Sequence, residues 1–375
     1  MFILLFSLLA WGAETPQVRL IETGPSMADR KWLSEGGIEV LSAESHEAGR
    51  CAGFFDVTHT AAQWDVLGRK IFSPGAPLSL ETASVGVGSE RKPWIARLVD
   101  EIDAQKMMAT VQQLNTYHTR HARSSTGVEA AEWIASQFRV LAAGRTDIEV
   151  DLIRHRDFGQ PSVRARILGK GARAHEVLII GAHEDSIRQW DFGGRGRAPG
   201  ADDDASGVAT VLETFRIVAQ SGVRPERTLE FITYAGEELG LLGSQEIALD
   251  YKNRGVAVVA VLQFDMTMVP GPQTEMHFIT DHTNLELSDA MRALTDLYVG
   301  VRWSNTECGY ACSDHASWTR AGFRSAFPFE SSFDGLNSRI HTERDLPDSV
   351  QPDFGAAFAK LSVAFLGEFG GNLAR

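Results

Sequence analysis

The chain has 375 residues, with 49 Asp and Glu against 36 Lys and Arg and a formal net charge of −13. Its composition, 43% hydrophobic and 23% charged, excludes collagen-like, low-complexity and largely disordered proteins, and its length is ample for a full hydrophobic core. The acidic balance argues against a general nucleic-acid-binding protein, because binding phosphates needs clustered positive charge.

The chain begins with a short apolar segment, residues 2–11, which is about half the ~20 residues that a membrane helix needs. Small residues follow it, so we interpret residues 1–13 as a secretory signal peptide, with a buried N-terminal strand as the alternative. Residues 14–89 end in a run of Gly, Ser and Val typical of a flexible junction. The main domain would therefore span residues 90–375.

Apolar spacing predicts the elements of this domain. It predicts two helices followed by two half-buried strands, over 94–117, 127–141, 148–153 and 162–168. Strands and helices then alternate, at 176–181, 205–220, 228–234, 239–251 and 256–264. Further strands are predicted near 275–280 and 324–329, and further helices near 285–298 and 352–369. Apolar strands separated by helices indicate an α/β fold with a mainly parallel central sheet flanked by helices on both faces.

Histidine and carboxylate residues follow the ends of the central strands. His183 and Asp185 come after the first, Glu237 and Glu238 after the second, and Asp265 after the third. Ligands of open α/β sheets bind beyond the carboxyl ends of the strands. We therefore expect these side chains to form one site.

An acidic triplet, Asp202, Asp203 and Asp204, and a distant His341 complete the set of candidate metal ligands. Imidazole combined with carboxylate suits zinc better than calcium. A pair of metal ions needs a bridging carboxylate, and any one of the three aspartates would serve. Asp204 also directly precedes a predicted helix, where it would act as an N-cap.

Adjacent residues in an extended chain point to opposite sides, so Glu237 and Glu238 are expected to have different roles. One would bind metal, and the other would act as general base. Asp185, two residues after His183, would accept the other ring proton of that histidine. Each of these residues alone would be an ordinary polar residue of a loop or helix start, but their occurrence at successive strand ends favours a site.

Other hydrolase and nucleotide-binding motifs are missing from the sequence. It has no Gly-x-Ser-x-Gly, no phosphate-binding Gly-x-x-x-x-Gly-Lys-Ser/Thr and no His-Glu-x-x-His. Cys308 and Cys312 frame a short loop that a disulfide would close in an oxidising compartment, with metal ligation by both thiolates as the alternative. Cys51 would stay unpaired.

From about residue 92 to the end, the sequence resembles the bacterial leucyl aminopeptidase type of secreted two-zinc aminopeptidase. The matching segments are 181–186, 198–207, 234–238, 262–267, 308–318 and 339–342. The resemblance implies that Asp203 bridges two Zn²⁺ ions. It places His183 and Asp265 on one ion and Glu238 and His341 on the other.

The resemblance also assigns the remaining roles. Glu237 would be the general acid/base, Asp185 would orient His183, and Tyr310 would help to bind substrate. The apolar pocket for the N-terminal side chain would comprise Met266, Ile279, Phe327, Phe329, Phe333 and Ile340. Two positions depart from the family pattern, because Phe327 replaces a methionine and Leu336 replaces a tyrosine. Relatives carry an inhibitory or folding-assisting propeptide, which here would be residues 14–89 of a zymogen.

The sequence therefore predicts a secreted, monomeric zinc aminopeptidase, extracellular or periplasmic, that removes large apolar residues such as leucine from peptides and proteins with a free N-terminus. No nucleic acid is expected as a partner, nor a membrane once the signal peptide is removed. The alternatives are a glutaminyl-cyclase-like transferase with a single zinc ion and a non-catalytic binding protein on the same fold. The complete set of candidate ligands favours the aminopeptidase.

Overall fold

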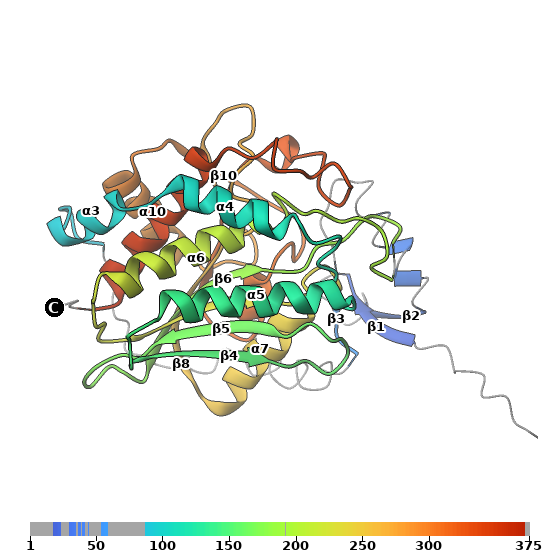
Figure 1. Ribbon diagram of the computed structural model, residues 1–375, viewed down its shortest axis with the longest axis horizontal. Coiled ribbons are helices and arrows are strands. Elements are labelled where there is room, and N and C mark those ends of the chain that lie inside the picture. Colours follow the sequence, from blue (N-terminus) through green and yellow to red (C-terminus); the bar gives the residue numbers. More distant parts are fainter. Residues whose placement is uncertain are drawn as a thin grey trace, which may run out of the picture.

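The computed structural model describes residues 18–23, 30–34, 37–38, 40–41, 44, 54–58, 87–191 and 193–371 (Figure 1). The expected signal peptide and Cys51 lie outside these residues. Among the described helices, none is both long enough and apolar enough to cross a membrane.

The central sheet has the strand order β11 (Ser325–Ala326), β8 (Ala257–Gln263), β6 (Glu176–His183), β7 (Thr228–Tyr234), β5 (Ser162–Ile167) and β4 (Ile148–Ile153). The β11–β8, β8–β6 and β6–β7 pairings are parallel. The β7–β5 and β5–β4 pairings are antiparallel. The predicted α/β fold with a mainly parallel sheet is therefore confirmed, with two antiparallel strands added at one edge.

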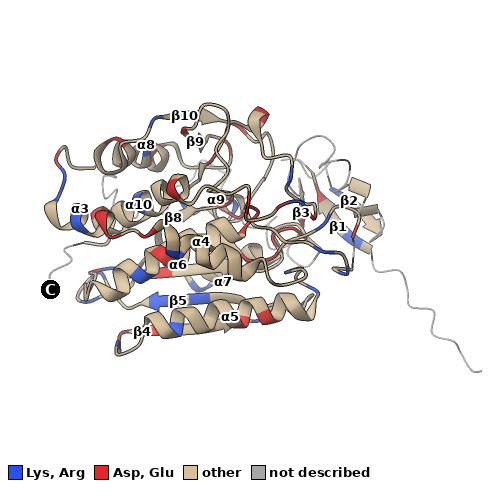
Figure 2. Ribbon diagram, turned by 45° about the horizontal axis from the view of Figure 1, so that its top comes forward, with Lys and Arg blue, Asp and Glu red and all other residues tan. Residues whose placement is uncertain are grey.

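Cross-strand ion pairs connect the two strands of the antiparallel edge. Arg164 and Arg166 give β5 its basic segments in Figure 2. Arg164 pairs with Asp151 at 2.9 Å, and Arg166 pairs with Glu149 at 2.7 Å, both on β4. Each pair joins residues that lie directly opposite each other in the strand register. Such partly exposed pairs contribute only modestly to stability, but opposite charges favour this register over a shifted one.

Helices cover both faces of the sheet, as predicted. One layer contains α3 (Pro93–Asp100), α4 (Ala104–Leu114), α5 (Ser125–Leu141), α6 (Ala205–Gln220), α8 (Leu285–Leu294) and α10 (Pro352–Phe369). The other contains α7 (Leu242–Arg254) and α9 (His315–Arg320). Alternate residues of β6 divide between the layers, since Ile180 packs in the α6 layer and Ile179 in the α7 layer. Both are fully buried.

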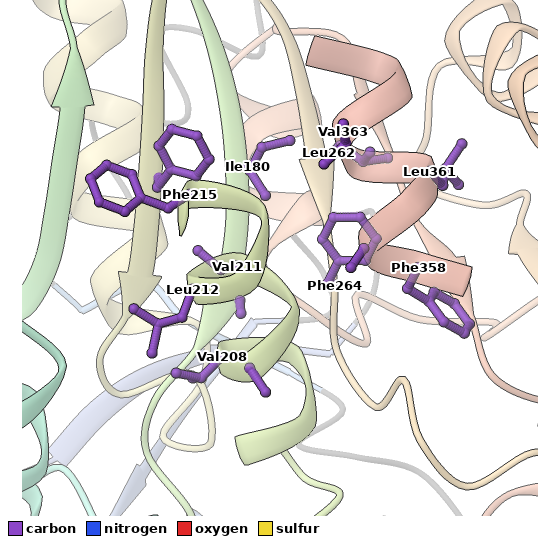
Figure 3. Close-up of a cluster of buried hydrophobic side chains, with 14 of the residues drawn as sticks. Ile180, Val208, Val211, Leu212, Phe215, Leu262, Phe264, Phe358, Leu361 and Val363 are labelled. Atoms are coloured by element: carbon purple, nitrogen blue, oxygen red, sulfur yellow. The ribbon is translucent and has the colours of Figure 1, made fainter. Parts of the chain in front are cut away.

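Aromatic packing fills the core beneath α6 (Figure 3). The Phe215 ring lies 4.9 Å from Phe138 and 5.1 Å from Phe231, centroid to centroid, and both pairs meet edge to face. Fully burying a side chain of this size contributes about 1.5–3 kcal/mol. This packing fixes α6 on the sheet and with it the loop that precedes the helix.

The predicted helix over 94–117 is wrong in one respect, because the structure divides it into α3 and α4. Asp103 lies between the two helices, and its side chain accepts hydrogen bonds from the backbone N–H groups of Gln105 and Lys106. An aspartate N-cap starts a new helix because it satisfies N–H groups that have no partner within the helix.

A second, smaller sheet has the order β10 (Trp303–Thr306), β9 (Met276–Ile279) and β12 (Pro328–Phe329). The predicted strand over 324–329 is therefore split, with Ser325–Ala326 in the central sheet and Pro328–Phe329 in this one. β10 and α9 were not predicted from the sequence, and they are only four and six residues long. The predicted helix at 285–298 is α8 followed by a π-helical turn, Thr295–Val299.

The described part of residues 14–89 includes an antiparallel sheet in the order β2 (Arg30–Ser34), β1 (Val18–Glu22) and β3 (Phe55–Asp56). We call it the N-terminal sheet; it lies to the right of the central sheet in Figure 1. Its Phe55 is buried in the same apolar cluster as residues of α7 and α9. The division into signal peptide, propeptide and catalytic domain stays a prediction.

Candidate metal centre

The parallel strands β6, β7 and β8 bring the predicted ligands to one edge of the sheet. His183 is the last residue of β6, Glu237 and Glu238 lie in the turn that follows β7, and Asp265 follows β8 by two residues. Asp203 lies just before α6 and joins them there. All these side chains are buried.

Asp203 lies between the two histidines. Its Oδ1 is 3.0 Å from His183 Nε2, and its Oδ2 is 2.8 Å from His341 Nε2. Spacing alone left the choice among the three aspartates open. The structure places Asp203 where one carboxylate can face two ligand groups at once.

The other two aspartates of the triplet have different contacts. Asp204 Oδ1 accepts the backbone N–H groups of Gly207 at 2.8 Å and Met266 at 3.0 Å, and its Oδ2 accepts that of His183 at 3.1 Å. It is therefore the N-cap of α6, as predicted, and it also ties the ends of β6 and β8 together. Asp202 accepts a hydrogen bond from the Asn337 side chain at 2.8 Å.

Two groups of ligand atoms lie on either side of Asp203. On one side, His183 Nε2 is 3.5 Å from Asp265 Oδ1. On the other, His341 Nε2 is 3.1 Å from Glu238 Oε2. Asp203, Glu238 and His341 each offer an atom within 4.8 Å of the others, as do His183, Asp204 and Asp265. Asp204 already accepts hydrogen bonds from three backbone N–H groups. We therefore regard Asp203, in place of Asp204, as the better metal ligand beside His183 and Asp265.

The electrostatics of the site fit bound cations. Burial raises the pKa of Glu237 well above its usual range, and it raises the pKa of Glu238 to about 7 despite the nearby His341. Burial disfavours a charged His341, yet Glu238 and Asp203 hold its pKa well above the ordinary value. Burying this many carboxylates is costly unless a positive charge balances them.

Two of the buried carboxylate oxygens support the same conclusion. Glu237 Oε1 and Glu238 Oε1 have no hydrogen-bond partner within the part of the chain that the structure describes. Buried polar atoms of native proteins are normally paired. A donor set of imidazole nitrogens and carboxylate oxygens, with two oxygens left unpaired, fits a divalent metal such as zinc.

Three supporting residues hold the ligands in place. Asp185 Oδ1 lies 3.5 Å from His183 Nδ1, and its predicted role in orienting that histidine stays a prediction. Asp345 accepts the backbone N–H groups of Asp202 and Asp203 at 3.0 and 3.1 Å. Arg120, fully buried, donates to the backbone carbonyls of Glu184, Pro199 and Gly200, at 2.6–2.9 Å.

Asp345 and Arg120 were not predicted from the sequence. Asp345 is one of three acidic residues within seven positions after His341, and nothing in the sequence distinguishes it from Glu343 and Asp348. Arg120 lies between two helices, in a segment without periodicity, and it acts through backbone atoms some 64–80 positions away. For neither residue does the local sequence indicate a role at the site.

The residues predicted to bind the substrate side chain form one apolar cluster next to the metal centre. Its buried members include Met266, Ile279, Tyr310, Phe327 and Phe329, and Phe333, Leu336 and Ile340 pack against them. Met266 follows the ligand Asp265, and Ile340 precedes the ligand His341. The structure thus gathers all six residues predicted to line the pocket in one apolar cluster, and their role in substrate binding stays a prediction.

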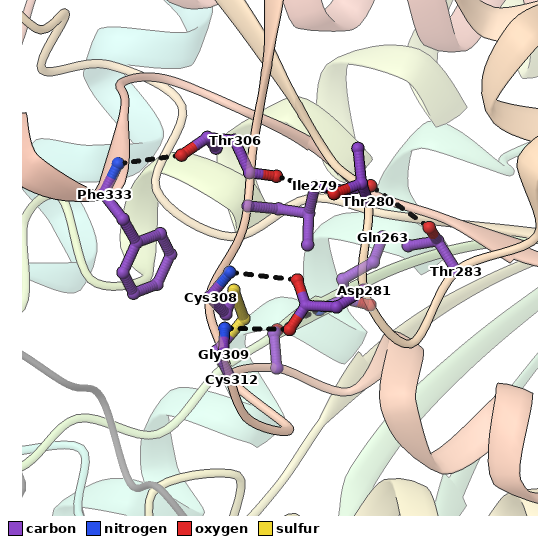
Figure 4. The surroundings of a disulfide bond; sticks show 11 residues. Gln263, Ile279, Thr280, Asp281, Thr283, Thr306, Cys308, Gly309, Cys312 and Phe333 are labelled. Atoms are coloured by element: carbon purple, nitrogen blue, oxygen red, sulfur yellow. Dashed lines mark hydrogen bonds between the residues drawn. A yellow bond between two sulfur atoms is a disulfide. The ribbon is translucent and has the colours of Figure 1, made fainter.

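A disulfide joins Cys308 and Cys312, as predicted in preference to metal ligation by the two thiolates (Figure 4). Asp281 accepts the backbone N–H groups of Cys308 and Gly309, both at 2.9 Å. The closed loop carries Tyr310, whose ring lies 6.1 Å from the Phe333 ring, centroid to centroid. The disulfide and Asp281 therefore position one wall of the apolar cluster.

Comparison with known proteins places these features in a family. Residues 162–366 match the family described as Peptidase family M28. A probable leucine aminopeptidase of Arthroderma benhamiae is 35% identical over 372 residues, covering 96% of each chain. Among solved structures, the LapA aminopeptidase of Legionella pneumophila aligns with a TM-score of 0.83 and 28% identity, over 96% of this chain and 100% of that one. LapB of the same organism aligns with a TM-score of 0.79 and 30% identity, over 94% and 95%. The chain belongs to peptidase family M28 and is a metallo-aminopeptidase.

Proposed function

We propose that the protein is a secreted, monomeric, two-zinc aminopeptidase that hydrolyses the N-terminal peptide bond of peptides and proteins, with a preference for large apolar residues such as leucine. The observation that carries the proposal is the position of Asp203 between His183 and His341, at 3.0 and 2.8 Å. A carboxylate placed in this way can be shared by two metal ions.

In this proposal His183 and Asp265 hold one zinc ion, Glu238 and His341 hold the other, and Asp203 is shared. When bound, zinc polarises the scissile carbonyl and lowers the pKa of water. The family membership and the unpaired carboxylate oxygens support this assignment.

Glu237 is the proposed proton carrier. Its carboxylate is buried beside the ligands, and burial raises its pKa, so it holds a proton more readily than an exposed glutamate does. Water adds to the carbonyl carbon while Glu237 takes its proton. Glu237 then delivers that proton to the leaving nitrogen as the carbon–nitrogen bond breaks, giving a free amino acid and a shortened peptide.

The apolar cluster supports the proposed side-chain preference. Met266, Phe329 and Phe333 lie in it, and it adjoins the ligands Asp265 and His341 in sequence and in space. Burying a leucine side chain against such a surface contributes about 1.5–3 kcal/mol. Phe327 and Leu336, the two departures from the family pattern, also lie in this cluster and would tune which large residue is preferred.

Secretion is part of the proposal. Removal of residues 1–13 would release the protein to an extracellular or periplasmic compartment. The disulfide between Cys308 and Cys312 supports this location, because disulfides persist in oxidising compartments.

The test is hydrolysis of leucine p-nitroanilide by purified protein, with zinc-loaded and chelated samples compared. The free amine and its N-acetyl counterpart are assayed side by side, and zinc is counted by mass spectrometry. We expect two zinc ions per chain and chelator-sensitive cleavage of the free amine only. Cleavage of the acetylated substrate at a similar rate, or no cleavage by folded protein containing two zinc ions, would contradict the proposal.

A further inference from the structure

The N-terminal sheet touches the turn that carries Glu237 and Glu238. The backbone N–H of Asp56 donates to the carbonyl of Gly240 at 3.2 Å. The buried amide of Gln245 donates to two carbonyls, that of Gly240 at 2.7 Å and that of Asp56 at 3.2 Å. Gln245 on α7 therefore joins the N-terminal sheet to this turn.

Gly240 is the point of closest approach. A Cβ atom at this position would lie 2.8 Å from Phe54 Cε2 and 2.9 Å from the backbone nitrogen of Asp56, so a larger residue would push the sheet away. On the inner side of the turn, the N–H groups of Gly240 and Leu241 both donate to the carbonyl of Glu237, at 2.9 and 2.8 Å. The turn is held between the metal centre and the N-terminal sheet.

Apolar and charged contacts extend the same interface. Phe55 and Val57 are buried in one cluster with Leu241 and Trp318. Arg320 of α9 lies 4.6 Å from the centre of the Phe55 ring and pairs with Glu22 of β1 at 2.7 Å. Detaching the sheet would expose these apolar surfaces and would leave the buried Gln245 amide without its partner on β3, and both changes are costly.

We propose that the N-terminal sheet, residues 18–22, 30–34 and 54–58, is a permanent part of the active enzyme and positions the Glu237 turn, in contrast to a propeptide that is discarded. This inference rests on the proposed function, because it gives the turn its catalytic role. The solved Legionella LapA chain includes a counterpart of this N-terminal region. Its alignment covers 96% of this chain, whereas residues 90–375 alone make up about three quarters of it.

The first test uses the full chain with a specific protease site inserted between Thr58 and Val87. The protein is cut and then passed over a gel-filtration column under native conditions. We expect both fragments to elute together and kcat to stay within about twofold of the uncut enzyme, since a buried interface persists without the covalent link. Elution of the small fragment by itself overturns the proposal. This result needs no turnover, so it reports on the sheet even if the proposed activity fails.

The second test weakens the contact in the intact chain. Gln245→Ala is expected to lower kcat roughly tenfold or more and to shift the pH profile of kcat, with KM and zinc content nearly unchanged, because small displacements of a catalytic group are costly. Trp32→Ala, in the same sheet but 60% exposed, is the matched control and should leave kcat unchanged. If Gln245→Ala does not fold, Phe54→Leu probes the same contact. An unchanged kcat in the folded variant overturns the positioning role.

Discussion

Asp185 Oδ1 accepts a hydrogen bond from the backbone N–H of Glu237 at 3.0 Å. Its other oxygen accepts the backbone N–H of Glu238 at 3.3 Å. The resemblance to leucyl aminopeptidases gives Asp185 only one task, the orientation of His183. The structure adds a second, because the same carboxylate fixes the turn after β7 to the end of β6.

Asp185→Asn should therefore disturb both sides of the metal centre. The amide keeps one acceptor oxygen but loses the other and the negative charge. We expect zinc affinity or kcat to fall about 10–100-fold, the usual cost of losing a group that supports a metal ligand. Zinc titration and steady-state kinetics would measure this. Asp151→Asn, at the edge strand β4, is the control and should change neither quantity; equal behaviour of the two variants would contradict the role of Asp185.

Glu237→Gln should separate catalysis from metal binding. The substitution preserves shape but removes the group that accepts a proton, so we expect kcat to fall about 10²–10⁴-fold with zinc content unchanged. Glu238→Gln is the informative comparison, because the loss of a proposed metal ligand should lower the zinc content as well as kcat. Activity retained by Glu237→Gln would remove the proposed role of this residue.

The site residues at the strand ends illustrate what could be predicted from the sequence. Apolar strands with His183, Glu237 or Asp265 at or just after their carboxyl ends are local patterns. The rule that parallel strand ends meet at one edge of a sheet brings these side chains together. The position of β9 depends instead on its pairing with β10 and β12, which are distant in sequence. No local pattern encodes that choice of partner.

The supporting contacts were harder still to predict. Asp204 was expected to cap a helix, and it does, but its bonds to His183 and Met266 depend on how the ends of β6 and β8 meet the start of α6. Arg120 binds backbone carbonyls, which every residue has. The side-chain sequence therefore does not indicate which residues it binds. The gathering of side chains at neighbouring strand ends could therefore be predicted, whereas hydrogen bonds to backbone groups distant in sequence could not.

Removing the disulfide should affect substrate binding more than metal binding. With Cys308 and Cys312 both changed to Ser, the loop that carries Tyr310 would lose its covalent closure, while the hydrogen bonds to Asp281 would remain. We expect KM for leucine p-nitroanilide to rise by roughly tenfold, as ordering the loop would then oppose binding. Zinc content should stay constant. A raised zinc loss with unchanged KM would place the disulfide in the metal centre instead.

Phe327→Met should change side-chain preference, because it restores the residue expected from the family pattern. Phe327 is buried in the apolar cluster and packs against Phe329, with ring centroids 5.5 Å apart. We expect kcat/KM for phenylalanine p-nitroanilide to rise relative to leucine by several-fold, since small changes in pocket volume are worth about 1–3 kcal/mol. Phe323→Met, in the cluster on the α7 side of the sheet, is the control and should leave the ratio unchanged.

His315 should make the folded protein sensitive to mild acid. It is fully buried, its ring lies 4.9 Å from the Phe327 ring, and burial lowers its pKa to about 3. The unfolded chain, with a histidine pKa of about 6.5, binds this proton first as the pH falls. The stability that depends on a neutral His315 is therefore complete above about pH 6.5 and is lost progressively as the pH falls toward 3, with about 2 kcal/mol lost at pH 5.

His315→Gln should remove this contribution, so its stability should fall less than that of the wild type between pH 7.5 and pH 5. Chemical denaturation at pH 7.5 and at pH 5 gives the change in the free energy of unfolding for each protein. The cost of burying the glutamine amide is the same at both pH values, so it cancels from this change. His175→Gln, at an exposed position, should keep the acid sensitivity of the wild type. If His315→Gln lost as much stability as the wild type over this range, His315 would not be the group that takes up the proton on unfolding.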